Sequence, residues 1–425
     1  MHDWVARDAA VVWHGFTQME CFADNAPLIV ERAEGRELID IHGRRYLDAI
    51  SSLWVTTLGH GIAELDQALR EQLQRVAHST LLGNGNRTVI EFAEALARVV
   101  PVDRPHFLFA SDGASAVEQA LKIAFQYWAN QGIRERTTYL AFGAAYHGDT
   151  LGSLSVGGGG FGTEIFDPLR FPVLRAPSFA DPQALTAAAH LVQEHHRRLA
   201  AVVVEPLIQG AAGMLLAAPD SFAVLARACS ETGVLLICDE VASGFGRTGT
   251  LFASEQCRLR PDLLCLGKGI TGGYLPMSAT VANQRVYDQF LGPDLSERTL
   301  YHGHSYGGNA LAAAVALKHL ELLLQPHVLQ NVQERSSQLR RALQPLEHLD
   351  VVKDIRLLGL MGAVELHADR DARLARRTCA AMVRRGVLSR SMGNVVTLVP
   401  PLTVTAAEIA RIVAVLAEAL AEVSA

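Results

Sequence analysis

Two short apolar runs in the middle of the chain each lead to a charged residue. Residues 234–238 are followed by Asp239, and residues 263–266 are followed by Gly267 and Lys268. Apolar runs bounded by turn-forming residues predict buried strands of a parallel sheet, and ligands bind beyond the carboxyl ends of such strands. We therefore expect a carboxylate and an amine at one edge of one sheet.

The lysine in this pair is placed to act as a nucleophile. Glycines stand on both sides of Lys268 and apolar residues precede it, so the amine is expected to lose solvation, which favours its neutral form. A solvated surface lysine is the ordinary alternative for any single lysine. The pairing with Asp239 and the flanking glycines favour the reactive interpretation.

Two more turns are predicted at the same edge. Residues 107–110 form an expected strand that leads through Asp112 and Gly113 into a helix, and the free amides of a helix start attract anions. Tyr146 follows an expected strand at 138–142, where its ring could stack on a flat ligand. A simple helix cap and a core tyrosine are the corresponding structural alternatives.

One ligand requires an anion-binding turn, an aromatic ring, an acid and an amine together, and that ligand is pyridoxal 5′-phosphate. Its phosphate would lie at the helix that starts at Gly113, and Tyr146 would stack on its ring. Asp239 would pair with the ring nitrogen and keep it protonated. Lys268 would form a Schiff base with the aldehyde and, once released by substrate, would serve as the base for the substrate proton.

The order of elements around these residues predicts an α/β fold. From about residue 105 strands alternate with helices, which indicates a mostly parallel central sheet flanked by helices. We expect an N-terminal segment at 1–58 that packs with the small domain, a large domain at 59–324, and a small C-terminal α+β domain at 325–425. The N-terminal segment is expected to contain strands at 27–30 and 38–41.

The bulk composition excludes several classes of protein. The chain has 425 residues, 49% of them hydrophobic, with a net charge of −6 and six cysteines. These values argue against disorder and against a nucleic-acid partner. No CxxC pair, no metal-ligand spacing, no signal peptide and no membrane-length apolar run are read in the sequence. We expect a cytoplasmic protein that acts on small molecules.

Three longer motifs connect the site to a known family. DEVASGFGRTG, CLGKGITGG and YHGHSYGGNALAAA resemble the class III, or ω-type, aminotransferases of the type I pyridoxal-phosphate fold, over nearly the whole chain. SSLWVTTLGH, AAYHGDTLGSLSV and SRSMGNVVTLVPPL resemble more narrowly the branch that acts in biotin synthesis. This resemblance implies a ping-pong conversion of 8-amino-7-oxononanoate to 7,8-diaminononanoate, with S-adenosylmethionine as the favoured amino donor.

The resemblance also implies roles for particular residues of a homodimer with active sites at the subunit interface. Arg247 would support the cofactor edge. The cofactor phosphate would be bound by Gly113 and Ala114, and by His304 and Ser305 of the neighbouring subunit. The substrate would contact Phe16, Trp54, Tyr146, Lys268 and Gly303, with its carboxylate held by Arg390, since a guanidinium binds carboxylates in a bidentate manner.

One departure from the family pattern concerns the amino donor. The segment at 13–17 reads WHGFT, where the adenosylmethionine-using members carry WHPYT, so Phe16 keeps the ring but lacks the hydroxyl. A site built around that hydroxyl should bind its usual donor differently, and lysine remains an alternative donor. Another class III enzyme acting on ornithine or 4-aminobutyrate, and an aminomutase or decarboxylase of the same fold, also remain open.

Overall fold

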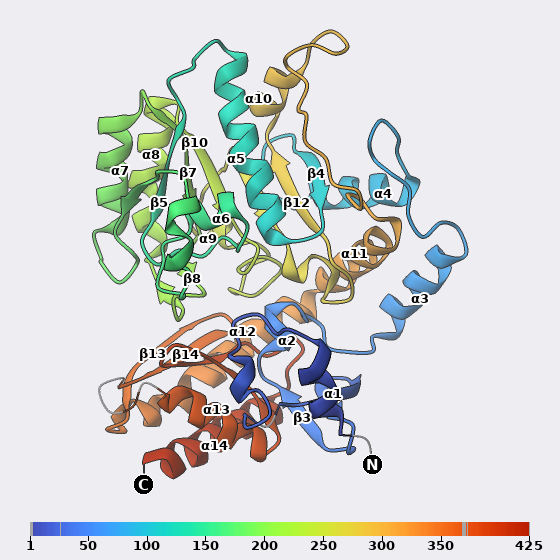
Figure 1. Ribbon diagram of the computed structural model, residues 1–425, viewed down its shortest axis with the longest axis vertical. Coiled ribbons are helices and arrows are strands. Elements are labelled where there is room, and N and C mark those ends of the chain that lie inside the picture. Colours follow the sequence, from blue (N-terminus) through green and yellow to red (C-terminus); the bar gives the residue numbers. More distant parts are fainter. Residues whose placement is uncertain (1–2, 26, 368–370, 372, 425) are drawn as a thin grey trace.

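The computed structural model describes residues 3–25, 27–367, 371 and 373–424. In Figure 1 the middle of the chain forms the upper body, whereas the N-terminal and C-terminal parts together form the lower body. Within the described residues, no helix combines the length and the apolar character that crossing a bilayer requires.

The upper body is built around a seven-stranded sheet with the order β4-β12-β11-β10-β7-β5-β6. β12 pairs antiparallel with both β11 and β4, and the other pairings are parallel. Two antiparallel pairings in succession restore the direction, so β4 runs the same way as β11, β10, β7 and β5. The strands are β4 (His106–Ala110), β5 (Thr138–Phe142), β6 (Leu174–Ala176), β7 (Leu199–Val204), β10 (Leu235–Asp239), β11 (Leu263–Leu266) and β12 (Ser278–Ala282).

Helices cover both faces of this sheet, which explains why its central strands are apolar throughout. In β10, Leu235 and Ile237 pack with α5 on one face, and Leu236 and Cys238 face the core that contains α7 and α8. The helices of this body are α3 (Ala63–Leu73), α4 (Arg87–Ala97), α5 (Gly113–Asn130), α6 (Leu151–Val156), α7 (Ala184–His195), α8 (Phe222–Thr232), α9 (Ala253–Gln256), α10 (Gln284–Tyr287) and α11 (Ala310–Leu323). A small hairpin, β8 (Ile208–Gln209) with β9 (Leu215–Leu216), lies beside them.

The lower body contains two four-stranded sheets, β1-β2-β3-β15 and β13-β14-β17-β16. The first sheet joins the two ends of the chain, because β3 near the N-terminus pairs with β15 near the C-terminus. The strands are β1 (Val30–Glu34), β2 (Glu37–Asp40), β3 (Arg45–Asp48), β13 (Val352–Leu358), β14 (Met361–Leu366), β15 (Val387–Leu388), β16 (Arg390–Met392) and β17 (Val395–Leu398). The helices are α1 (Trp4–Val11), α2 (Ser51–Trp54), α12 (Pro326–Leu343), α13 (Leu374–Arg384) and α14 (Ala406–Ser424).

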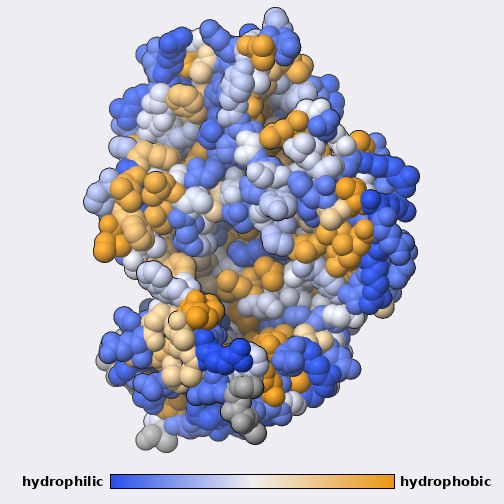
Figure 2. Space-filling view, turned by 45° about the vertical axis from the view of Figure 1, so that its right-hand side comes forward, coloured by the Kyte–Doolittle hydropathy of each residue, from blue (hydrophilic) through white to orange (hydrophobic). Residues whose placement is uncertain are grey.

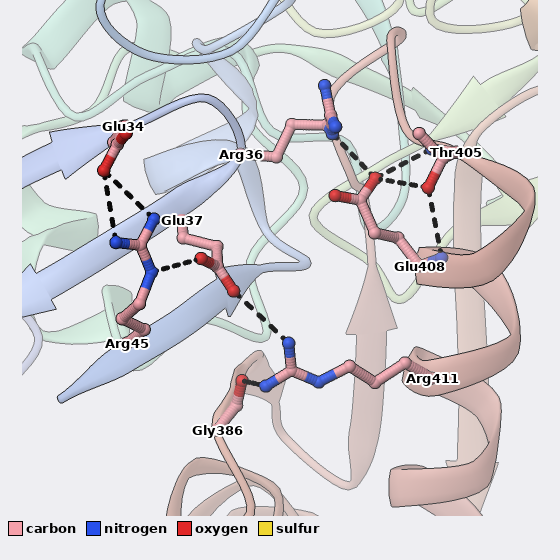
Figure 3. Close-up of polar contacts among 8 residues, drawn as sticks. All are labelled: Glu34, Arg36, Glu37, Arg45, Gly386, Thr405, Glu408 and Arg411. Atoms are coloured by element: carbon pink, nitrogen blue, oxygen red, sulfur yellow. Dashed lines mark hydrogen bonds and ion pairs between the residues drawn. The ribbon is translucent and has the colours of Figure 1, made fainter.

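Ion pairs reinforce this junction between the chain ends, as Figure 3 shows. Arg36 Nε donates to Glu408 Oε2 of α14 at 2.7 Å, and Arg411 of α14 lies 3.3 Å from Glu37 of β2. The N-terminal strands are therefore attached to the last helix by side chains as well as by the β3–β15 pairing.

The expected alternation of strands and helices and the mostly parallel sheet are confirmed. The expected strand at 27–30 is wrong: β1 covers Val30–Glu34, because its hydrogen bonds to β2 begin at Val30. β1 is polar and largely exposed, so it carried no apolar signal. The domain boundaries near residues 58 and 324 remain predictions.

Candidate active site

A cavity of about 530 Å³ opens at the carboxyl edge of the central sheet. Figure 2 shows a hollow with apolar atoms around it between the upper and lower bodies. The cavity walls include Trp54, Gly113, Ala114, Tyr146, Asp239 and Lys268. Five of these residues follow or end strands β4, β5, β10 and β11, whereas Trp54 comes from the lower body.

The N-terminus of α5 forms one wall of the cavity. The Asp112 side chain caps the helix by accepting from the Ser115 amide at 2.8 Å. Gly113, the first residue of the helix, lies against Val241, and an added Cβ would come within 2.5 Å of Val241 Cγ1. The absence of a side chain at Gly113 therefore lets the helix start approach the segment after β10. Because Asp112 occupies the Ser115 amide, the amides of Gly113 and Ala114 are the ones that can receive an anion.

Asp239 is held in a fixed orientation at the end of β10. Its Oδ1 accepts from the Val241 amide at 3.0 Å, and its Oδ2 lies 2.7 Å from His147 Nδ1. A carboxylate only accepts hydrogen bonds, so a carboxylate at Asp239 requires His147 Nδ1 to be the donor of this contact. Asp239 and His147 are both buried, so the carboxylate is presented to the cavity from a rigid support.

Lys268 faces Trp54 across the cavity. The ammonium nitrogen lies 4.9 Å from the centre of the Trp54 ring. Burial lowers the Lys268 pKa from its ordinary value, although the nearby carboxylates of Asp239 and Glu205 act in the opposite direction. The lysine backbone is left-handed, with φ of 41°, a conformation that non-glycine residues rarely adopt and that is often found at functional sites.

Tyr146 is fixed at three points. Its hydroxyl donates to Asp149 Oδ2 at 2.8 Å, its amide donates to Glu205 Oε1 at 3.2 Å, and its ring meets Phe161 edge-on at 5.5 Å. Burial, followed by the Asp149 hydrogen bond, raises the Tyr146 pKa. The side chain therefore stays a neutral phenol at physiological pH.

Glu205 is a buried carboxyl beside these groups, at the end of β7. Its two oxygens accept from the amides of Tyr146 and Gly210. Burial raises the Glu205 pKa to about 7, an effect that His147 opposes and Asp239 reinforces. This carboxyl therefore changes its protonation near neutral pH, and its negative charge acts on Lys268.

Other residues predicted for the site lie elsewhere in the single chain. Phe16 is exposed in the segment before β1, and Arg390 is exposed on β16. Gly303, His304 and Ser305 precede α11. Gly303 and Ser305 contact the α3–α4 connection, where His78 Nε2 lies 2.8 Å from the Ser305 carbonyl. None of these five residues lines the cavity described above. Their roles remain predictions.

Arg247 was expected to support the cofactor edge, and it is fully buried. Its guanidinium donates to the carbonyls of Thr56 and Pro400 at 2.9 and 2.7 Å. These bonds connect the segment after β10 to both ends of the chain.

Sequence reasoning missed three residues that shape the cavity. His147 adjoins Tyr146 in the sequence and could have been proposed as a partner for a carboxylate. Glu205 directly follows the apolar run at 199–204 and could have been proposed as an acid at the same sheet edge. Val241 could not be identified from the sequence, where it is one apolar residue among many. Only the structure shows that Gly113 and Gly267 both pack against its side chain.

The arrangement suits a flat, anionic ligand that reacts with an amine. Helix amides lie at one side, a carboxylate stands at the base, aromatic rings form two walls, and a lysine with a lowered pKa faces the space between them. Among the described residues, no group of three or more histidine, cysteine or acidic side chains is arranged to hold a metal ion.

Comparisons with known proteins give a consistent result. The family model for class III aminotransferases matches residues 19–420. The adenosylmethionine-8-amino-7-oxononanoate aminotransferase of Nitratidesulfovibrio vulgaris is 45% identical, over 96% of this chain and 79% of the relative. The crystal structure of the enzyme with that name from Methanocaldococcus jannaschii has a TM-score of 0.94 at 38% identity and covers 98% of both chains. A PLP-bound amine transaminase from an uncultivated Pseudomonas species has a TM-score of 0.90 at 34% identity, over 97% of this chain and 98% of that one.

Proposed function

This chain belongs to the class III aminotransferases, and from that premise we propose that it transfers an amino group to 8-amino-7-oxononanoate in biotin synthesis. The product is 7,8-diaminononanoate, and S-adenosylmethionine is the proposed amino donor. The observation that carries the proposal is the near full-length similarity, at 45% and 38% identity, to proteins that bear the name of this reaction.

Pyridoxal 5′-phosphate is the cofactor of this enzyme, and the cavity residues fit it. The start of α5 and the Gly113–Val241 contact provide a close-fitting anion cradle, and Asp239 offers a buried carboxylate to a ring nitrogen. The indole Nε1 of Trp54 and the imidazole Nε2 of His147 are buried without a hydrogen-bond partner among the described residues. Buried polar atoms that lack a partner at a cavity wall are expected where a polar ligand binds.

The bound cofactor supplies an electron sink for the substrate carbon that loses its proton. Lys268 would hold the cofactor aldehyde and would move the proton at that substrate carbon, a role that its lowered pKa favours because more of the amine is neutral. Asp239, oriented by His147 and Val241, keeps a proton on the ring nitrogen. Tyr146 orients the ring, and Trp54 together with Tyr146 lines the substrate pocket and excludes water.

Residues remote from the cavity complete the proposal. We assign Arg390 to the substrate carboxylate and Phe16 and Gly303 to the substrate pocket. We assign His304 and Ser305 to the phosphate bound by the neighbouring subunit of a cytoplasmic homodimer. The exposure of Phe16 and Arg390 in the single chain supports this assignment, because a second subunit or a bound substrate would cover them.

The donor is tested by single half-reactions of the purified enzyme loaded with cofactor. We expect S-adenosylmethionine to change the visible absorption of the bound cofactor and lysine to leave it unchanged, with Lys268→Ala as the inactive control. A change in cofactor absorption with lysine, and none with S-adenosylmethionine, would overturn the proposal that S-adenosylmethionine is the donor.

The acceptor is tested by rescue of a biotin-requiring strain that lacks this transaminase. An enzyme for ornithine or 4-aminobutyrate should fail to restore growth. Failure of a well-expressed wild-type chain would overturn the proposed reaction.

A further inference from the structure

Trp54 reaches the cavity from α2 (Ser51–Trp54), a single turn whose backbone is non-helical at Ser52 and Leu53. Ser51, Ser52 and Trp54 all have positive φ, of 53°, 61° and 64°. Residues with side chains disfavour this left-handed region for steric reasons, so three of them in one turn must be held by interactions with their surroundings.

Asp48, at the end of β3, provides those interactions. Its Oδ1 accepts from the amides of Ile50 and Ser52 at 3.3 and 3.1 Å, and its Oδ2 accepts from the Ser52 amide at 2.9 Å. His60 Nε2 lies 3.0 Å from the same Oδ2. The Asp48 side chain is fully buried, which shields its carboxyl oxygens from competing water.

The turn sets the place of the Trp54 ring. The ring packs on Gly210, where an added Cβ would come within 3.1 Å of Trp54 Cζ3, and Lys268 Nζ lies 4.9 Å from the ring centre. A small rotation of the turn would therefore either open space beside Gly210 or press the ring toward the lysine.

We infer that Asp48 is a positioning residue: by holding the left-handed turn, it fixes the Trp54 wall of the cavity and so determines how tightly substrate binds. The inference rests on the proposed function in one respect, namely that substrate meets the Trp54 wall. It concerns the binding of substrate at that wall, and Asp48 itself does not line the cavity around Lys268.

The turn has other attachments that keep the chain folded when Asp48 is replaced. Ser51 Oγ donates to the Val399 carbonyl at 2.7 Å, and Arg247 donates to the Thr56 carbonyl at 2.9 Å. We therefore expect Asp48→Ala to fold with a loosened turn. Should it fail to fold, the double variant Asp48→Ala/Ser52→Gly is used, since glycine adopts a left-handed backbone without strain.

Asp40 in the same sheet provides a matched control. It is buried to a similar degree as Asp48 and also caps a turn, accepting from the amides of His42 and Arg44, from Arg44 Nε and from the Tyr46 hydroxyl. It does not line the cavity around Lys268. Asp40→Ala thus removes a similar number of hydrogen bonds without touching the Trp54 turn.

The first measurement is amide hydrogen exchange of the segment 49–57, which needs no substrate. We expect Asp48→Ala to lose protection there, and Asp48→Asn to retain most of it, because the remaining amide oxygen still accepts from the Ile50 and Ser52 amides. Asp40→Ala should leave the protection of this segment unchanged. Unchanged protection in Asp48→Ala, or a loss in Asp40→Ala as large as in Asp48→Ala, would refute the inference.

The second measurement is steady-state kinetics with the full holoenzyme. For Asp48→Ala we expect KM for the acceptor or the donor to rise by about tenfold or more, with kcat close to wild-type. A misplaced pocket wall weakens binding of the ground state and of the transition state alike, and such a loss raises KM alone. Asp48→Asn should restore KM. A fall in kcat without a change in KM, or no rescue by asparagine, would overturn the assignment. If the wild-type enzyme accepts none of the proposed substrates, the proposed function fails, and the exchange experiment still decides the role of Asp48.

Discussion

Replacing Gly113 with alanine should damage cofactor binding through a single steric contact. The new Cβ would lie 2.5 Å from Val241 Cγ1 and 3.0 Å from Cγ2. Carbon atoms normally pack at about 3.5–4.0 Å. Either the Val241 side chain, the start of α5 or the segment after β10 must therefore give way by about 1 Å. The two segments border the predicted phosphate and ring-nitrogen sites.

Two opposing effects determine the change in stability. Overpacking of this kind costs about 1–3 kcal/mol, whereas alanine gains up to about 1 kcal/mol over glycine inside a helix, and less at its first residue. We expect the clash to win, with a net fall of about 1–2 kcal/mol in the free energy of unfolding. Interactions at a helix N-terminus contribute up to about 2 kcal/mol, so their misalignment should weaken pyridoxal phosphate binding by up to roughly thirtyfold.

The assay is equilibrium titration of the apoprotein with pyridoxal phosphate, followed by absorption, beside urea unfolding of the same samples. Val241→Ala alone measures the cost of removing the valine. In the double variant Gly113→Ala/Val241→Ala the space vacated by the valine should accommodate the new methyl group, so affinity should recover to that of Val241→Ala. Wild-type affinity in Gly113→Ala, or no recovery in the double variant, would refute the steric reasoning.

Two further substitutions address the lysine and a second buried acid. After borohydride reduction, Lys268→Ala should carry no covalently attached cofactor, as measured by mass spectrometry. Its rate of transamination should fall by about 10²–10⁴-fold, because the base is lost. A substantial fraction of protein with attached cofactor would contradict the assignment of Lys268. Glu240 is fully buried and accepts from the amides of Ala253 and Ser254, and burial raises its pKa from 4.5 to about 7. A carboxyl whose pKa is raised on folding contributes stability that is present below pH 4.5 and is lost as the pH rises through about 7. Between about pH 5 and pH 8 the free energy of unfolding of the wild-type enzyme, measured with urea, should therefore fall by about 2–3 kcal/mol relative to that of Glu240→Gln. A difference between the two proteins that stays constant with pH would contradict this.

Much of the central sheet could be predicted because its signal is local. β5 and β11 have the predicted bounds, since each is a short apolar run limited by turn residues. β1 was misplaced because it is polar and is defined by pairing with β2. The left-handed turn before Trp54 could not be foreseen either. Its residues carry no glycine signal, and its conformation depends on Asp48, His60 and the Val399 carbonyl, the last of which lies 348 residues from Ser51 in the chain.

The sequence by itself determined the chemistry of this protein. Gly113, Tyr146, Asp239 and Lys268 each lie at or just after the end of a strand, and the residues next to them in the sequence define that strand. The comparisons confirm the family and the cofactor that those residues indicated. Tertiary structure alone decided the shape of the cavity. The Trp54 wall, the His147 contact with Asp239 and the Val241 wedge arise where segments distant in sequence pack together, and such contacts leave no pattern in any one stretch of the chain.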